Sequence, residues 1–215
     1  FDERNSIVEY GRKLISSRLT TGTGGNLSIY NRAEGLIAIK PSAVDYFNIQ
    51  PEDVVVVTPT GEIVEGNLKP SIELPFHLDL LNHREDINAV LHTHQVYATT
   101  LACMEWELPA VHYLVGVSGK KVPIAKYASI GTQELSNNII EAIGNYNACL
   151  MSHHGLVAVG KDMKSAFNVA EEIELVAQIY IQCKSMGEPP ILSDEEMMII
   201  AEKFKTYKQP KKMSN

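Results

Sequence analysis

Ala89-Val90-Leu91-His92-Thr93-His94 is the stretch that decides how this chain folds. Its apolar start and polar end predict a buried strand, and the spacing from Tyr97 to Ala102 predicts a helix directly after it. Two more apolar runs, Ala148 to Ser152 and Leu156 to Val159, predict buried strands on either side of a turn that carries His153 and His154. Buried strands interspersed with helical patterns predict a layered α/β fold.

The rest of the chain extends this pattern in both directions. Residues 3 to 18 have apolar side chains at the spacing of an amphipathic helix, and several short β-prone segments follow them. Asp162 is placed to cap a long helix, and Ser193-Asp194-Glu195-Glu196 has the Ser-x-x-Glu form of a capping box for a last one. The other expected strands are Asn26–Tyr30, Leu36–Ile39, Asp53–Thr58, Glu62–Val64 and Val122–Ile124, and the other expected helices are Ser71–Leu81, Gln133–Ala142 and 163–182.

The composition is that of an ordinary globular protein. Of the 215 residues, 45% are apolar and 21% are charged, and no repeat, low-complexity tract or Gly/Ser linker divides them. We therefore expect a single domain over residues 1–207, followed by a loose basic tail over residues 208–215. The three cysteines are widely separated and odd in number, which predicts reduced core thiols rather than a disulfide framework.

Charge and hydropathy argue against some classes of partner. The chain has 19 basic and 26 acidic residues and a formal net charge of -7, which is unfavourable for binding nucleic-acid phosphates or anionic lipid. No apolar run approaches the ~20 residues of a membrane helix. The first residues also lack the basic and apolar regions of a signal peptide, so the expected location is the cytoplasm.

The chemistry is concentrated in histidines at strand ends. Because side chains alternate across a strand, His92 and His94 project from the same face while Thr93 points away, which makes a bidentate arm for a metal. His153 and His154 point to opposite faces, so at most one of them can share a metal with the first pair. Three imidazoles suit zinc, iron, cobalt or manganese, with a fourth position open to water or a carboxylate. The alternative, four histidines that only hydrogen-bond within the core, would bury many titratable groups without a shared task.

A glycine-rich loop and two polar turns supply candidate anion-binding groups. Gly22-Thr23-Gly24-Gly25-Asn26-Leu27-Ser28 exposes backbone N–H groups and adds hydroxyl and amide donors, although a simple turn before a strand has the same composition. Lys40-Pro41-Ser42 and Lys69-Pro70-Ser71 offer further hydroxyl and ammonium donors. Glu73 follows near the start of a helix, where the dipole favours its charge, but composition alone makes it only a surface carboxylate.

These segments together carry a family resemblance. The chain resembles the class II aldolase/epimerase family in four motifs that occur in the family's order: Thr23-Gly24-Gly25-Asn26-Leu27-Ser28, Lys69-Pro70-Ser71-Ile72-Glu73, His92-Thr93-His94 and His153-His154-Gly155. The likeness covers nearly the whole chain and continues through Pro109-Ala110-Val111-His112-Tyr113 to Lys203-Phe204-Lys205-Thr206-Tyr207. It implies a three-layer α/β/α fold with a central, largely antiparallel sheet flanked by helices.

The resemblance also implies a zinc site and an aldol reaction. One Zn²⁺ per subunit would be held by Glu73, His92, His94 and His154, with His153 facing away. The implied reaction is the reversible cleavage of a ketose 1-phosphate, with L-fuculose 1-phosphate as the expected substrate and dihydroxyacetone phosphate and L-lactaldehyde as products. The metal would stabilise the charge of an enediolate, and Glu73 would move the proton at the nucleophilic carbon.

The same likeness assigns the remaining groups of the site. Tyr113, reaching in from a neighbouring subunit, would donate a proton to the aldehyde oxygen, and Tyr207 would help to close the site. These roles imply a homotetramer with active sites at subunit interfaces; the alternative for either tyrosine is a half-buried packing residue. The phosphorylated sugar would be bound by Thr23, Gly25, Asn26, Ser42, Ala43, Ser71 and Ile72.

Three positions depart from the family pattern. Ile72 stands where a second serine usually precedes the glutamate, Ala43 replaces the usual glycine of its turn, and Lys40 matches the pattern of an L-ribulose-5-phosphate 4-epimerase. That epimerase is therefore the main alternative, although the segment ending in Tyr207 favours the aldolase. A methylthioribulose-1-phosphate dehydratase and a metal-free scaffold of the same fold are further alternatives, and the scaffold would need none of the four intact ligand positions.

Overall fold

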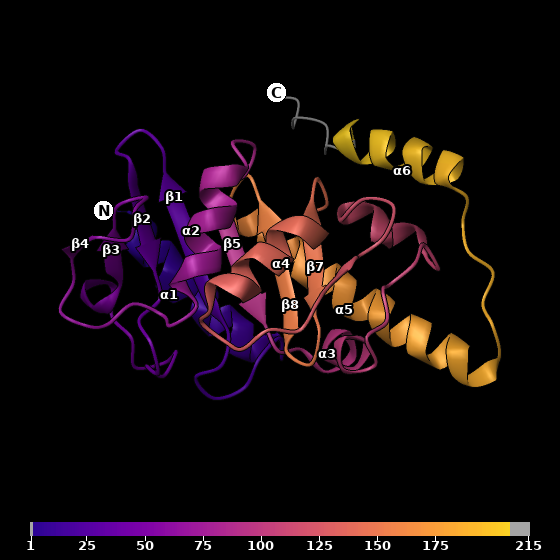
Figure 1. Cartoon of the computed structure of the whole chain (residues 1–215), viewed down its shortest axis with the longest axis horizontal. Coiled ribbons are helices and arrows are strands. Elements are labelled where there is room, and N and C mark those ends of the chain that lie inside the picture. The colour runs from indigo at the N-terminus through magenta and orange to yellow at the C-terminus, as the bar shows by residue number, and fades with distance from the viewer. Residues whose placement is uncertain (1, 207–215) are drawn as a thin grey trace, which may run out of the picture.

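The computed structural model describes residues 2–206, in which eight strands form one sheet (Figure 1). The strand order is β4-β3-β2-β1-β5-β8-β7-β6, and every neighbouring pair is antiparallel except β6 and β7. The expected, largely antiparallel sheet is therefore confirmed. The strands are β1 (Asn26–Asn31), β2 (Leu36–Ile39), β3 (Val55–Val57), β4 (Ile63–Glu65), β5 (Ala89–Thr93), β6 (Ile124–Ala125), β7 (Ala148–Met151) and β8 (Gly155–Gly160).

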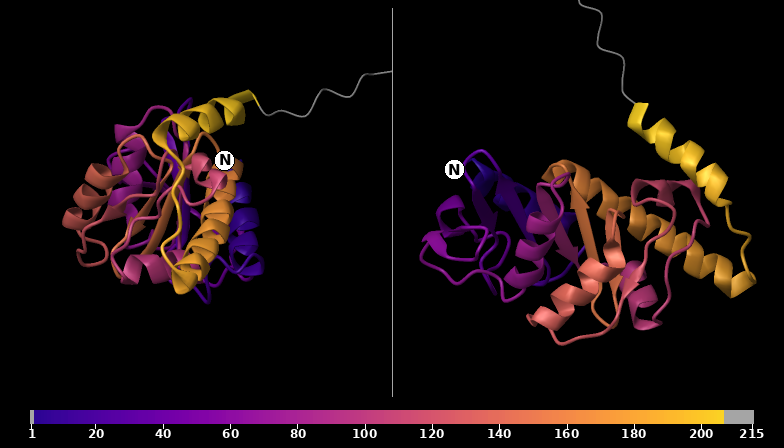
Figure 2. Two further views of the ribbon diagram at one scale, coloured as in Figure 1. Left: turned by 90° about the vertical axis from the view of Figure 1, so that its right-hand side faces the viewer. Right: turned by 45° about the horizontal axis from the view of Figure 1, so that its top comes forward.

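Helices cover both faces of this sheet, as the end-on view in Figure 2 shows. Val90 and Leu91 of β5 point to opposite faces, and each belongs to a separate apolar cluster. The Val90 cluster includes Phe76 of α2 and Ile139 of α4, whereas the Leu91 cluster takes its helical side chains from α1, α3, α5 and α6. The helices are α1 (Glu3–Ser16), α2 (Leu74–His83), α3 (Val96–Cys103), α4 (Gln133–Ile143), α5 (Met163–Met186) and α6 (Asp194–Thr206), with short 3-10 turns η1 (Pro51–Asp53) and η2 (Tyr113–Val117).

Side-chain caps set the starts of the late helices. The Asp162 carboxylate accepts a hydrogen bond from the backbone N–H of Ser165 at 2.7 Å, which begins α5 where the sequence predicts it. At α6, the Ser193 hydroxyl accepts from the backbone N–H of Glu196 at 3.2 Å, which is one half of the expected capping box. α5 ends at Gly187, whose φ of 151° few other residues adopt.

Element ends differ from the sequence pattern where turns compete with strands and helices. The helix expected from Ser71 begins only at Leu74, because the preceding residues form a turn. The strand expected over 53–58 shortens to β3, since η1 occupies its start. Val122 forms an isolated bridge with Leu108 rather than the start of β6.

The three cysteines are free thiols, but the expectation that they lie in the core is wrong for two of them. Cys149 on β7 is buried, and its burial raises the pKa of its thiol to about 12. Cys103 is exposed because it is the last residue of α3, and Cys183 on α5 is partly exposed. Among residues 2–206, no helix is both long and apolar enough to cross a membrane.

Strand register brings the histidine and glycine segments to one end of the sheet. His92 on β5 stands opposite Asn26, the first residue of β1, and opposite Val157 on β8. The end of β5 therefore lies between the glycine loop that leads into β1 and the turn that joins β7 to β8. The turn before α2 reaches the same end, where Pro70 bridges to Pro41.

Candidate metal centre and active site

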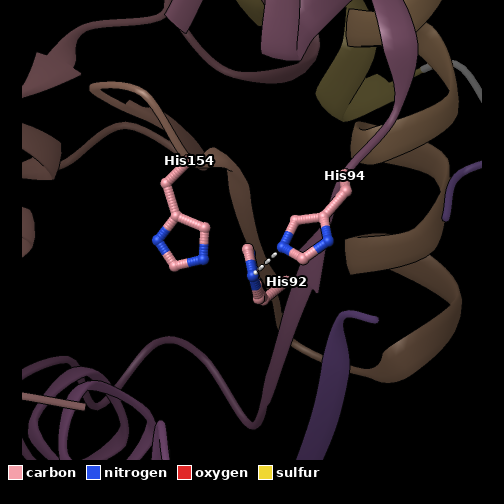
Figure 3. Close-up of side chains that lie close together, drawn as sticks. All are labelled: His92, His94 and His154. Atoms are coloured by element: carbon pink, nitrogen blue, oxygen red, sulfur yellow. Dashed lines mark hydrogen bonds between the residues drawn. The ribbon is translucent and has the colours of Figure 1, made fainter. Parts of the chain in front are cut away.

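Three imidazoles converge at this end of the sheet (Figure 3). His92 is on β5, His94 follows directly after the strand, and His154 lies in the turn before β8. One ring nitrogen from each lies within 4.8 Å of the others. The Nε2 atoms of His92 and His94 are 2.9 Å apart, and the ring centroids of His92 and His154 are 4.7 Å apart. The three rings therefore present their nitrogens to one shared point, which is the arrangement a metal ion requires.

Hydrogen bonding fixes the tautomer of the central ring. His92 has no exposed surface, and its Nδ1 lies 3.0 Å from the carbonyl oxygen of Leu156. A carbonyl can only accept, so Nδ1 carries the proton and Nε2 keeps the lone pair that a metal needs. Figure 3 shows that this Nε2 faces the other two rings.

Burial also keeps the three rings neutral. It lowers the pKa of His92 well below its ordinary value, and the charges of His154 and His94 lower that pKa further. The same burial, together with the charge of His94, lowers the pKa of His154 to about 4, and burial lowers the pKa of His94. Near pH 7 all three rings are therefore neutral, which is the form that binds metals.

Glu73 completes the cluster from the turn before α2. The residue is 5% exposed, so it is not the surface carboxylate that composition suggests. Oε2 lies 3.4 Å from Nε2 of His92 and accepts a 2.8 Å hydrogen bond from the Asn26 amide, whereas Oε1 lies 3.4 Å from Nε2 of His154. Burial raises the pKa of Glu73, and the Asn26 hydrogen bond opposes that rise.

The donor set fits a divalent cation. Oε1 of Glu73 is buried and has no hydrogen-bond partner, which is costly for a carboxylate oxygen unless a cation satisfies it. Beside it stand three imidazoles that are neutral near pH 7. Three imidazoles and one carboxylate are a ligand set that suits zinc.

Close packing explains the glycines on both sides of the histidines. A Cβ on Gly155 would lie 2.3 Å from the carbonyl oxygen of Thr93, and one on Gly24 would lie 2.9 Å from Nδ1 of His94. A Cβ on Gly25 would lie 2.6 Å from the carbonyl oxygen of His92. These glycines let the backbone pass directly against the metal-site segments, which is a more specific role than that of a simple turn.

The amide of Asn26 ties two of the expected sugar-binding residues together. It donates to Ser71 Oγ at 3.0 Å and to Glu73, so both of its hydrogens are in use. The backbone N–H of Glu73 also donates to Ser71 Oγ, at 3.3 Å. Asn26, Ser71 and Glu73 thus form one buried unit at the edge of the metal cluster.

The other expected sugar-binding residues lie in the surrounding turns. The backbone N–H of Ser42 donates to the carbonyl oxygen of Lys69 at 3.0 Å, which holds its turn beside Ser71. Ala43 follows with a φ of 55°, a left-handed conformation that glycine adopts without strain. Thr23 is exposed in the glycine loop, and Ile72 is 58% exposed between Ser71 and Glu73.

Lys40 does not offer its ammonium group at the surface as the sequence suggested. Its side chain is 2% exposed, and Nζ lies 4.5 Å above the ring of Tyr46 and donates to the carbonyl oxygen of Pro41 at 3.2 Å. Burial lowers the pKa of Lys40 to about 8. The Tyr46 hydroxyl in turn donates to the carbonyl oxygens of Gly24 and Gly25. Lys40 and Tyr46 therefore pack together beneath the glycine-rich loop and hold its backbone in place.

Tyr113 stands apart from this cluster in the single chain. Tyr113 begins η2, is 49% exposed, and packs near Phe204 of α6 with 6.3 Å between ring centroids. Among the described residues it makes no ring contact with the metal-site histidines. Tyr207 and the expected tail over 208–215 lie outside the described residues. His153 is 53% exposed, with Nε2 3.5 Å from Glu105, and it does not join the other three rings.

Several residues of the site escaped the sequence analysis. Gln95 donates to the carbonyl oxygen of Ala170 at 2.8 Å and accepts from the Thr93 hydroxyl. Glu174 on α5 accepts from the backbone N–H groups of Tyr97 and Ala98, both at 2.9 Å, and so caps α3 directly after His94. His77 and Ser28 hold Asn26 from behind. For His77 a signal was present, because it follows Glu73 by four residues and so lies on the same helical face.

Comparison with known proteins agrees with this geometry. Residues 5–181 match the class II aldolase and adducin N-terminal domain family. A 5-deoxy-D-ribulose 1-phosphate aldolase of Bacillus thuringiensis serovar kurstaki is 51% identical over 207 residues, covering 96% of this chain and 97% of the relative. An L-fuculose phosphate aldolase of Escherichia coli strain K12 is 38% identical over 211 residues, covering 95% and 97%.

A solved structure of an L-fuculose 1-phosphate aldolase superposes with a TM-score of 0.93 at 46% identity, covering 95% of this chain and 96% of that one. This similarity confirms the expected class II aldolase-like fold, and the sequence matches confirm the resemblance carried by the four motifs.

Proposed function

The chain belongs to the class II aldolase and adducin N-terminal domain family and is one of its metal-dependent aldolases, and from this premise we propose that it reversibly cleaves a ketose 1-phosphate to dihydroxyacetone phosphate and an aldehyde. One observation carries the proposal: a buried carboxylate oxygen of Glu73 without a hydrogen-bond partner lies beside three neutral imidazoles. Structural zinc sites are closed by four protein ligands, whereas a ligand that substrate can displace leaves a position for chemistry.

The metal is Zn²⁺, one per subunit, held by His92, His94, His154 and Glu73. When bound, it supplies a Lewis acid that polarises the substrate carbonyl and stabilises the negative charge that develops in carbon–carbon cleavage. Matched variants test this assignment. His154→Ala is expected to lose stoichiometric zinc and turnover, whereas His153→Asn keeps both, because an asparagine tolerates the left-handed φ of 55° at that position. Equal zinc content in both variants would overturn the assignment.

Glu73 is the general base of the proposed reaction. Burial raises the pKa of its carboxyl group, which brings its basicity closer to that of a useful proton acceptor. Asn26 donates a hydrogen bond to Oε2, so Oε1 is the oxygen that handles the proton. In the direction of synthesis it accepts a C–H proton of dihydroxyacetone phosphate, and in the direction of cleavage it returns that proton to the three-carbon fragment. The phosphate of the substrate is bound by residues from the surrounding turns. Ser71 and Ser42 donate their hydroxyl protons to it, and the backbone N–H groups of Gly25, Ala43 and Ile72 donate as well. Thr23 adds a third hydroxyl, and Asn26 acts through Ser71 and Glu73.

Tyr113 acts from a neighbouring subunit in this proposal. It is half exposed and, among the described residues, makes no ring contact with His92, His94 or His154 of its own chain, which supports a role in another subunit's site. The assembly is then a cytoplasmic homotetramer, with Tyr207 closing the site. Tyr113→Phe is expected to slow carbon–carbon cleavage and to spare proton exchange between dihydroxyacetone phosphate and solvent. Equal loss of both reactions would contradict a role confined to the aldehyde.

Two substrates follow from the relatives, and one assay separates them. 5-Deoxy-D-ribulose 1-phosphate would give acetaldehyde, and L-fuculose 1-phosphate, as expected in fucose degradation, would give L-lactaldehyde. The 51% identical relative favours the first and the solved structure at 46% favours the second. The zinc-loaded protein is incubated with each ketose 1-phosphate, and the dihydroxyacetone phosphate released is measured by coupled reduction. Release of dihydroxyacetone phosphate that a chelator abolishes supports the aldolase.

L-Ribulose 5-phosphate is the control for the epimerase alternative. Lys40, the residue that suggested this activity, has its ammonium group buried over Tyr46 rather than exposed at the glycine loop. We therefore expect no D-xylulose 5-phosphate. Its formation, with no release of dihydroxyacetone phosphate from either ketose 1-phosphate, would replace the aldolase by the epimerase.

A further inference from the structure

A second buried histidine lies behind the metal cluster. His77 on α2 has no exposed surface and is four residues beyond Glu73. Its Nδ1 lies 2.7 Å from the hydroxyl oxygen of Ser28, and its Nε2 forms a short hydrogen bond with the carbonyl oxygen of the Asn26 side chain. Burial lowers the pKa of His77 to about 3, so its ring carries a single proton near neutral pH.

Proton positions in this chain of contacts follow from what each atom can do. The Asn26 carbonyl oxygen can only accept, so Nε2 of His77 must carry the ring proton. Nδ1 is then a lone pair, and it accepts from the Ser28 hydroxyl, which is the only proton source in that contact. The hydrogen bonds therefore run in one direction, from Ser28 through His77 to Asn26.

The direction matters because an amide can be turned around. If His77 carried its proton on Nδ1, its Nε2 would accept, and the Asn26 side chain would rotate to offer N–H groups to it. The Asn26 carbonyl oxygen would then face the carboxylate of Glu73, where two acceptors repel each other. The observed orientation instead gives Glu73 Oε2 a 2.8 Å hydrogen bond.

The orientation also determines which groups are free to meet a ligand. Ser71 Oγ accepts from both Asn26 and the backbone N–H of Glu73. Within the described part of the chain, no hydrogen bond uses the Ser71 hydroxyl as a donor, so its proton is available to an anionic group. Oε1 of Glu73 is likewise free of hydrogen bonds.

We propose that Ser28 and His77 are positioning residues that fix the side-chain amide of Asn26, so that Glu73 and Ser71 each present one free polar group to the site. Neither residue touches substrate. Ser28 and His77 lie 49 positions apart and meet only because β1 passes under α2. The consequence for turnover rests on the proposed function, whereas the hydrogen-bond direction does not.

A direct test locates the protons. Neutron diffraction from crystals of the zinc-loaded protein, exchanged into D₂O, is expected to show a deuteron on Nε2 of His77 and two on the Asn26 amide nitrogen, directed at Ser71 and Glu73. A deuteron on Nδ1 of His77, with the amide reversed, would overturn the proposal. This result is independent of which sugar phosphate the enzyme cleaves, so it stands apart from a failure of the proposed function.

A matched pair of variants tests the consequence for turnover. His77→Gln places an amide N–H near the position of Nε2 and can still donate to Asn26, whereas the shorter His77→Asn cannot reach it. With zinc saturating, we expect His77→Gln to keep kcat within about threefold and His77→Asn to lose ~10²-fold in kcat, the loss typical of a misplaced catalytic group. KM should rise in His77→Asn and stay near the wild-type value in His77→Gln, because a reversed Asn26 carbonyl would accept the Ser71 hydroxyl proton that otherwise meets the phosphate.

Controls separate positioning from packing. Both His77 variants should bind one zinc per subunit and unfold at similar urea concentrations. Ser136→Ala removes another buried serine hydroxyl, one that donates to Asp79 rather than to His77, and it should leave kcat unchanged. Equal kcat in the Gln and Asn variants would overturn the proposal. So would a fall of kcat in both variants that follows their loss of stability, because that would assign His77 to packing alone.

Discussion

Replacement of Gly155 by alanine is the most stringent test of how the metal centre is assembled. Gly155 begins β8, and its backbone is not in the left-handed region, so alanine adds no conformational strain. The added Cβ would nevertheless lie 2.3 Å from the carbonyl oxygen of Thr93. Cβ atoms in proteins essentially never approach closer than 3.0 Å, so β5 and the β7–β8 turn must separate by at least about 0.7 Å.

This displacement acts directly on the ligands. His154 precedes Gly155, and His92 and His94 flank Thr93, so the shift separates the imidazole of one segment from the two of the other. A bound metal tolerates changes of only about 0.2 Å in its ligand distances. We expect zinc affinity to fall at least about tenfold, and kcat at saturating zinc to fall ~10²-fold. Overpacking should also lower the free energy of unfolding by about 1–3 kcal/mol.

The assays are competition of the protein with a chromogenic chelator for zinc, steady-state kinetics, and urea unfolding. Gly160→Ala is the matched control, because its Cβ would lie 2.6 Å from the backbone nitrogen of Ala166, a comparable backbone clash at the opposite end of β8 from His154. It should lose stability and keep its zinc affinity. Wild-type zinc affinity and kcat in Gly155→Ala would refute the argument that this glycine sets the distance between the ligand segments.

Three further predictions concern single side chains. Glu73→Gln should lower kcat by about 10²–10⁴-fold while the urea midpoint stays within experimental error, since a neutral amide is less costly to bury than a carboxylate; full activity would remove Glu73 as the base. Burial lowers the pKa of Lys40 to about 8, so between about pH 8 and 10.5 the unfolded chain binds more protons than the native one and stability rises with pH. Measured by urea unfolding, the free energy of unfolding should rise by up to ~3 kcal/mol over this range, and Lys40→Met should lack the rise. Equal pH dependence in both proteins would show that Lys40 is not its source. Ala43→Gly should raise the free energy of unfolding by about 0.5–1 kcal/mol, because alanine is strained at a φ of 55°, and a lower urea midpoint would show that this strain is not significant.

Local patterns predicted the elements that place the histidines. The apolar run before His92 and the two apolar runs around His154 predicted buried strands. The structure confirms them as β5, β7 and β8. Alternation along a strand placed His92 and His94 together, and their Nε2 atoms are 2.9 Å apart. These outcomes depend on chain geometry over a few residues, which the sequence specifies directly.

Local sequence patterns did not predict the burial of Glu73. Its position near a helix start predicted an exposed carboxylate, and only the family resemblance placed it at the metal. In the structure it is 5% exposed, because the turn before α2 carries it over the end of β5 and beside Asn26. Lys40 is the converse case, since a lysine in a polar turn predicted an exposed ammonium group and the ring of Tyr46 holds it inside.

The sequence by itself determined the strands, the faces of their histidines and, through motifs in a known order, the family. Only the tertiary structure decided which polar groups meet and in which orientation. Asn26 and Glu73 are 47 positions apart, and Ser28 and His77 are 49 apart. Contacts at such separations depend on which strand pairs with β1 and on how α2 packs across the sheet, and the periodicity of one segment specifies neither.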